Sequence, residues 1–140
     1  IEHGYLVPAG SAIATIDAVD RPGIRIGAPQ GGSVNAFLAR SVKSATVVAS
    51  PSVPAGEEML KSGRADVFAA NKANLFELSE RLPGSRVLDG RIGVDEVAIA
   101  LPKSRQAGMT YLRKYVEDAK AESLVTAAVR RSGLRGAAEQ

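Results

Sequence analysis

A glycine-rich turn is the stretch of this sequence best suited to binding a ligand. The turn runs from Gly27 to Val34 as Gly-Ala-Pro-Gln-Gly-Gly-Ser-Val; an apolar run precedes it, and apolar residues at helical spacing follow it as far as Val42. This order predicts a strand, a tight turn and a helix, with unpaired backbone N–H groups at the helix N-terminus beside the Ser33 hydroxyl. Those donors and the helix dipole favour negative charge, so the corner is predicted to bind an anion.

Nucleotide-binding motifs do not fit this turn. Gly27 and Gly32 have the spacing of a P-loop, but Ser33 follows directly without the lysine that would bind phosphate. The glycines at 27, 31 and 32 also miss the G-x-G-x-x-G pattern. Two interpretations remain open from the turn alone: a small-carboxylate site, and a strand-to-helix connection that binds nothing.

A second polar position follows another predicted strand. Asn71 and Lys72 come directly after the apolar run 66–70, whose lack of alternation is typical of a strand buried on both faces of a parallel sheet. Ligands in such sheets bind beyond the carboxyl ends of the strands, so Ser33 and Asn71 are expected to face one crevice. Lys72 could hold an anion there, and an ordinary surface lysine is an equally good interpretation.

The remaining reactive side chains do not predict catalysis or a metal site. His3 is the only histidine and there is no cysteine, so neither a Ser-His-acid triad nor a Cys-His pair is expected, and His3 is predicted to lie on the surface. No cluster has metal-ligand spacing, and no cofactor is expected. Asp95-Glu96 and Glu57-Glu58 are adjacent acidic pairs, which diverge on a helix or strand and are predicted to be solvated.

Composition indicates one globular domain. The chain has 140 residues, of which 45% are apolar and 24% charged, and its net charge is only +3. The basic residues are dispersed and do not interleave with aromatic ones, so a nucleic-acid partner is not expected. No apolar run approaches a membrane span and no signal peptide is visible. The chain opens at Ile1 without methionine and resembles a piece of a longer protein.

The elements expected to position the site alternate between strand and helix. Strands are predicted at 5–7, 24–28, 45–49, 66–70 and 87–88, with helices after the second, third and fourth; Gly63 is expected to end one helix and Ser52 to cap it. The pattern predicts an α/β fold of three layers, a mainly parallel sheet flanked by helices. After these elements we expect an extended apolar run at 94–101, a helix carrying Met109 to Ala119, a last helix and a tail that frays from Arg135.

Taken together, these pieces resemble the extracellular solute-binding protein family 3, the periplasmic amino-acid-binding proteins of ABC importers. The resemblance covers residues 5–136, and no single piece of it is specific, but their order and spacing are. Its carriers are Tyr5-Leu6-Val7-Pro8, Asp20 to Gly27, Gly32-Ser33, Leu60 to Val67, Leu82-Pro83-Gly84, Ala98 to Lys103 and Gly133-Leu134.

The resemblance implies a periplasmic-binding-protein-like (type II) lobe within a two-lobed protein. Residues 1–19 would be a hinge strand and linker, 20–90 the second-lobe ligand-binding domain, 91–136 the return hinge strand and C-terminal helices of the first lobe, and 137–140 a frayed tail. The first lobe proper would be missing. The implied function is the substrate-binding component, or half of one, of a periplasmic ABC transporter, with a membrane permease as partner. A cyclic-acid dehydratase and the sensor domain of a receptor are the alternatives.

The resemblance also implies which residues bind the solute. They are Gln30, Gly31, Gly32, Ser33, Val34, Asn71 and Lys72. Asn71 stands where amino-acid binders usually have an aspartate for the ligand's ammonium group, so a carboxylate without an ammonium becomes plausible. Because the hinge strands and last helices would lack their first-lobe partner, a homodimer through these elements is expected.

Overall fold

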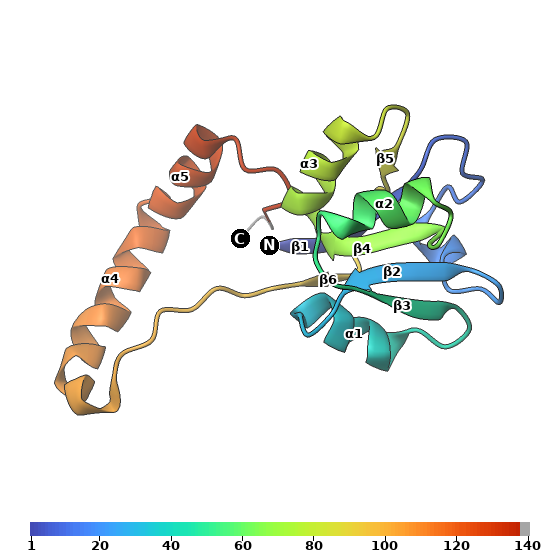
Figure 1. Cartoon of the computed structure of the whole chain (residues 1–140). Helices are drawn as coiled ribbons and strands as arrows, with labels where there is room; N and C mark the ends of the chain where they lie inside the picture. The colour runs from blue at the N-terminus through green and yellow to red at the C-terminus, as the bar shows by residue number, and fades with distance from the viewer. Residues whose placement is uncertain (138–140) are drawn as a thin grey trace. The chain divides into compact units, whose positions relative to one another are not determined.

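The computed structural model describes residues 1–137 as two compact units (Figure 1). The first comprises residues 1–95 together with the described part of the C-terminal segment from Arg135, and the second comprises residues 96–134. Among the described residues, none of the helices combines the length and the apolar character needed to cross a membrane.

The first unit is built on a six-stranded mixed sheet. Its strands are β1 (Glu2–Val7), β2 (Arg25–Pro29), β3 (Thr46–Ser50), β4 (Val67–Asn71), β5 (Arg86–Val87) and β6 (Gly93–Val94). The order is β3-β2-β4-β1-β5, with β6 also paired to β1. β2 is parallel to β3 and β4, as the alternating pattern predicts. β1 is antiparallel to β4, β5 and β6, so the sheet is mixed and not mainly parallel as predicted, because β1 is inserted beside β4 in the opposite direction.

Helices cover both faces of this sheet, which confirms the predicted three-layer α/β fold. Helix α1 (Ser33–Ser41) packs on one face through Val34 and Leu38. Helices α2 (Ala55–Lys61) and α3 (Lys72–Arg81) pack on the other face, around Phe68. Successive residues of β4 alternate between the two cores, so both its faces are buried and its sequence shows no polar alternation.

The connections have identifiable local causes. Gly63 follows α2 with φ of +65°, the left-handed conformation predicted for it. Ser52 Oγ accepts a hydrogen bond from the Ala55 N–H at 3.3 Å, although α2 itself begins only after Pro54. A single 3₁₀ turn, η1 (Ile16–Ala18), interrupts the loop between β1 and β2.

The second unit is helical. It contains the 3₁₀ segment η2 (Lys103–Gly108), α4 (Met109–Ala121) and α5 (Leu124–Ser132), after which Gly133 has φ of +64°. The extended apolar run expected at 94–101 forms a strand only at its first residue. Asp95 still exchanges backbone hydrogen bonds with Ile1, but no strand pairs with residues 96–101 among the residues described. Val97 is 83% exposed.

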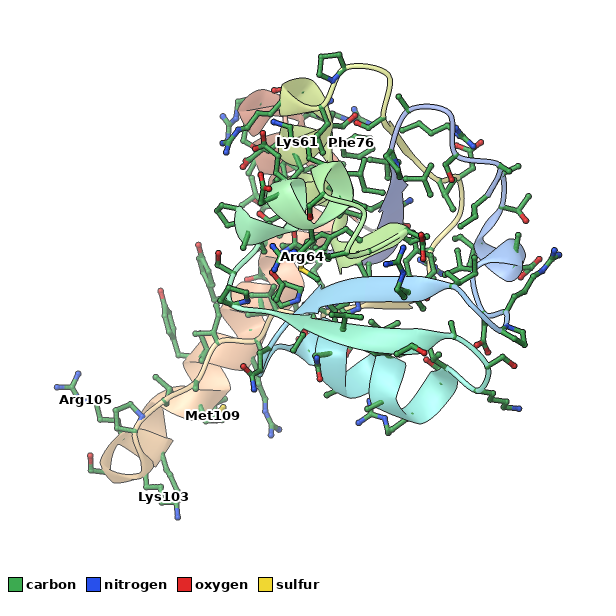
Figure 2. All side chains as sticks on the ribbon, turned by 45° about the vertical axis from the view of Figure 1, so that its right-hand side comes forward. Lys61, Arg64, Phe76, Lys103, Arg105 and Met109 are labelled. Carbon is green, nitrogen blue, oxygen red and sulfur yellow. The ribbon has the colours of Figure 1, made fainter. Side chains whose placement is uncertain are left out.

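The expectation that the tail frays from Arg135 is wrong for its first two residues. The Gly136 carbonyl accepts a hydrogen bond from the Glu2 N–H at 2.8 Å. The Arg135 guanidinium stacks 4.6 Å from the ring centroid of Phe76, which Figure 2 labels on α3, and pairs with Glu80. Of the tail predicted at 137–140, residues 138–140 lie outside the described residues.

Candidate functional site

The candidate site lies at the edge of the sheet where β2 and β4 end. Because β1 is antiparallel to β4, its first residues reach the same edge, and His3 lies opposite Asn71 on β4 and Gly93 on β6. Asp95 follows β6 directly. This edge therefore gathers residues from four separate parts of the chain.

The glycine corner has the predicted strand–turn–helix geometry. Gly31 has φ of +77°, and Gly32 is the N-cap residue of α1, with no side chain capping the helix. The first helical hydrogen bond runs from the Ala36 N–H to the Gly32 carbonyl, so the N–H groups of residues 33–35 precede it. The Gln30 N–H, by contrast, donates to the Ser50 carbonyl at 2.9 Å and belongs to the sheet. Of Val34, only the backbone N–H is available at the corner, because the side chain is buried in the core.

Asp95 lies at this corner and is not the freely solvated carboxylate that the sequence predicts. Its Oδ2 accepts a hydrogen bond from Ser33 Oγ at 2.9 Å and lies 2.9 Å from His3 Nε2. The His3 contact lowers the pKa of Asp95 most; partial burial opposes the shift and the Ser33 hydroxyl adds to it. The Asp95 side chain is still 39% exposed, so a solute can reach it.

His3 is buried, which corrects the expectation of a surface residue. Its side chain is only 3% exposed because β1 is an interior strand with β4 on one side and β6 on the other. Neither ring nitrogen has a hydrogen-bond partner of good geometry among the described residues, although Nε2 lies 2.9 Å from Asp95 Oδ2. The predicted strand began at Tyr5, whereas β1 begins three residues earlier, at Glu2. His3 therefore belongs to the strand itself.

The grouping of a serine, a histidine and an aspartate does not form a catalytic triad. In a triad the histidine lies between the other two and takes the serine proton. Here Asp95 lies between Ser33 and His3, and no hydrogen bond joins His3 to Ser33 in the described part of the chain. The serine hydroxyl donates to a carboxylate and is not activated as a nucleophile.

Asn71 and Lys72 are engaged within the protein. Asn71 caps α3, and its Oδ1 accepts a hydrogen bond from the Asn74 N–H at 3.0 Å. Lys72 Nζ donates to Glu2 Oε2 at 2.8 Å, which is the main cause of the lowered pKa of Glu2. Arg91 Nη1 lies 3.6 Å from the other oxygen of Glu2. The Lys72 charge is therefore already paired.

A shallow pocket of about 530 Å³ adjoins this ion pair. Its lining residues are Glu2, Lys72, Phe76, Arg91, Gly136 and Ala137. Among residues 1–137, no three or more His, Cys, Asp or Glu side chains are grouped so that they could hold a metal ion.

Comparisons with known proteins identify the fold. No protein-family model matches the sequence, and no curated protein matches it. Several solved structures do match the chain. One is an ancestral arginine-binding protein bound to arginine, with a TM-score of 0.69 and 17% sequence identity; the match covers 93% of this chain and 59% of that one. The solute receptor for L-cysteine of Neisseria gonorrhoeae matches at 0.69 and 18%, over 93% and 52%. The chain therefore has the fold of periplasmic amino-acid-binding proteins, as the sequence resemblance predicts.

One of the matching structures is that of an enzyme with the same fold. An ancestral cyclohexadienyl dehydratase matches at a TM-score of 0.55 and 18% identity, over 93% of this chain and 56% of that one. In each of these three structures this chain spans between about half and three fifths of the neighbour's length.

Proposed function

We propose that this chain is part of the substrate-binding component of an ABC importer, located in the periplasm, that presents a small amino-acid-like or carboxylate solute to a membrane permease. The observation that carries the proposal is the glycine corner at the α1 N-terminus, where the N–H groups of residues 33–35 are not capped by a side chain. The fold shared with arginine-binding and cysteine-binding proteins supports it.

The proposed ligand contacts come from two strand ends. Gly31, Gly32, Ser33 and Val34 form the corner after β2, and Asn71 is the last residue of β4 at the same edge. Asn71 can offer a ligand its amide N–H₂, while its Oδ1 already accepts one hydrogen bond from the Asn74 N–H. Lys72 follows Asn71 at the same edge with its charge paired to Glu2, and Gln30 contributes by holding the turn against β3.

We further propose the division of the chain that the sequence suggests. Residues 20–90 form the ligand-binding domain, while residues 1–19 and 91–136 supply the hinge strands and the helices that belong to a first lobe. The boundary between the two compact units at residues 95–96 falls within the second hinge segment, which supports this division.

A thermal-shift panel tests the proposed function. The chain is heated with each amino acid and with small carboxylates, and the longer gene product is tested in parallel. A ligand at 100 times its dissociation constant stabilises by about 2.7 kcal/mol, which raises the melting temperature by several degrees at this size. Ser33→Ala is expected to weaken the response, and Ser41→Ala, at the other end of α1, is the matched control. A flat panel for both proteins contradicts the proposal.

The second candidate function is a cyclic-acid dehydratase, which the dehydratase neighbour favours. Such chemistry needs a positioned acid. Asp89 and Glu96 are both exposed, whereas Asp95 is held at the corner by Ser33 and His3. Incubation with prephenate-like acids tests it, and turnover abolished by a single acidic substitution would establish it.

A further inference from the structure

We infer that a pocket beside the second half of α1 is a further ligand site of the first unit, which binds a small arylalkylamine, an ammonium group on a short aromatic body. The pocket has a volume of about 440 Å³, and Phe37, Ser41 and Val42 of this part of the chain line it. Every lining residue belongs to the first unit, and none is among the proposed solute contacts. The inference is therefore independent of the proposed function.

The observation that carries the inference is the hydroxyl group of Tyr5. Tyr5 is only 4% exposed, yet it lines the pocket, and its hydroxyl makes no hydrogen bond with any of residues 1–137. Among those residues, the unpaired side-chain atoms that are sealed from solvent are the two ring nitrogens of His3, so the Tyr5 oxygen is open to the pocket. A buried polar group without a partner is unfavourable, and a ligand that supplies the partner removes that cost.

The charged groups of the pocket are both acidic. Asp17 lies on η1 and Asp20 lies in the loop that follows it, and in the part of the chain described no lysine, arginine or histidine lines the pocket. The Asp20 carboxylate is held by backbone N–H groups of the turn after α1, whereas the Asp17 side chain is exposed. Both charges repel an anion and attract an ammonium group, from which the Tyr5 oxygen can accept a hydrogen bond.

The walls of the pocket are apolar and select for the body of the ligand. Ile16, Phe37, Val42 and Ile92 line it, and each of them is only partly buried against the core of the first unit. The apolar surface that they leave in contact with water is covered when an apolar ligand binds, which is favourable. A bare metal or ammonium ion would leave that surface wet. The Phe37 ring favours an aromatic body, because aromatic rings stack on one another.

Two probes of similar size and opposite charge test the inference on the full 140-residue chain. Phenethylamine and 3-phenylpropionate are titrated at neutral pH and constant ionic strength, and the backbone amide signals are followed by NMR. Phenethylamine is expected to shift the signals of Phe37, Val42 and Ile92, and to shift them more than those of Ser33 and Val34 at the glycine corner. Phenylpropionate is expected to leave all of them unchanged at the same concentrations.

Two variants test the polar groups of the pocket. Tyr5→Phe is expected to weaken the binding of phenethylamine about tenfold, the loss of one hydrogen bond to a charged group, and Tyr111→Phe at an exposed position of α4 is its control. Asp17→Asn is expected to weaken binding about threefold, as for an exposed ion pair. Its control is Asp89→Asn, which removes the same charge from an exposed position that does not line the pocket.

Several results would overturn the inference. They are shifts as large with phenylpropionate as with phenethylamine, shifts with neither probe, and shifts by phenethylamine that are confined to the glycine corner. Unchanged binding in Tyr5→Phe would also overturn it, because the hydroxyl would then not contact the ligand. The comparison of the two probes uses the unmodified chain, so it holds even if Tyr5→Phe does not fold. The proposed function is decided separately, by the thermal-shift panel.

Discussion

Asp20 shows how a single carboxylate can hold a turn in place through hydrogen bonds from the backbone. The Asp20 carboxylate accepts from the backbone N–H groups of Lys43, Ser44 and Ala45, at 2.9, 2.7 and 2.9 Å. These three donors lie in the turn between α1 and β3. One side chain from the β1–β2 loop therefore organises the turn that leads into the edge strand of the sheet.

Asp20 gives a prediction with a defined pH dependence. The Ala45, Ser44 and Lys43 N–H groups lower its pKa, so its stabilisation is present above the pKa of the unfolded state and is lost as pH falls through the folded pKa. Asp20→Asn is expected to lower the melting temperature clearly at pH 7 and much less in strong acid. Calorimetry at both pH values measures this, with Asp17→Asn as control; equal losses at both would contradict it.

The stabilisation of the fold by Tyr5 has the opposite dependence on pH. Tyr5 is 4% exposed, and burial, with a smaller contribution from Asp20, raises the pKa of its hydroxyl to about 12. Its contribution is complete below the unfolded pKa of about 10 and is lost as pH rises through the folded value. Tyr5→Phe is expected to extend the stable range in alkali, followed by circular dichroism from pH 9 to 12. Tyr111→Phe, at an exposed position, should change nothing.

At the scale of the elements, Phe68 fixes how α2 packs on the sheet. It lies on β4 opposite Gly27 of β2, and its ring also contacts Gly56 of α2. A Cβ atom at Gly56 would lie 2.4 Å from the ring, and one at Gly27 would lie 2.8 Å from it. Both glycines are therefore needed for close packing and not for a positive φ.

Gly56→Ala is expected to destabilise the protein although alanine is the better helix former. Overpacking a well-filled core costs about 1–3 kcal/mol, which exceeds the gain in helix propensity of about 1 kcal/mol. Urea denaturation measures the difference. Gly108→Ala is the control, because its Cβ would lie at an ordinary 3.6 Å from Leu101. A variant at position 56 as stable as the unmodified chain would show that α2 can shift without cost.

At the scale of the whole molecule, the second unit exposes large apolar side chains. They are Val97, Ile99, Tyr111, Tyr115, Leu124, Val125 and Leu134. Such a concentration in one 39-residue unit (96–134) is typical of a surface that binds a partner. We propose that a second copy of the chain covers it, through the C-terminal helices and hinge segments.

The prediction is a dimer at micromolar concentration, measured by light scattering. Tyr111→Glu together with Val125→Glu is expected to shift the mass to that of a monomer, because burying these charges in the interface is unfavourable. Glu substitutions at Thr110 and Thr126, also exposed on α4 and α5, are the control. A monomeric mass for the unmodified chain would rule the proposal out.

Much of the architecture follows from local pattern. Strands and helices between residues 24 and 88 are marked by short-range features: apolar runs, helical spacing, and glycines at turns such as Gly63. Because the connections are short, alternating elements leave few arrangements, so β2, β3 and β4 are parallel as predicted. That rule also places Ser33 and Asn71 at one edge.

The chemistry of that edge depends instead on contacts between distant residues. Ser33 and Asp95 are 62 positions apart, and Lys72 and Glu2 are 70 apart. No local pattern encodes these pairs. They arise because β1 lies antiparallel beside β4 and also pairs with β6, and the β1–β6 pairing brings His3 and Asp95 together. Because burial and hydrogen bonding depend on which segments pack side by side, His3 is buried and Asp95 is hydrogen-bonded to Ser33, although both were predicted to be solvated.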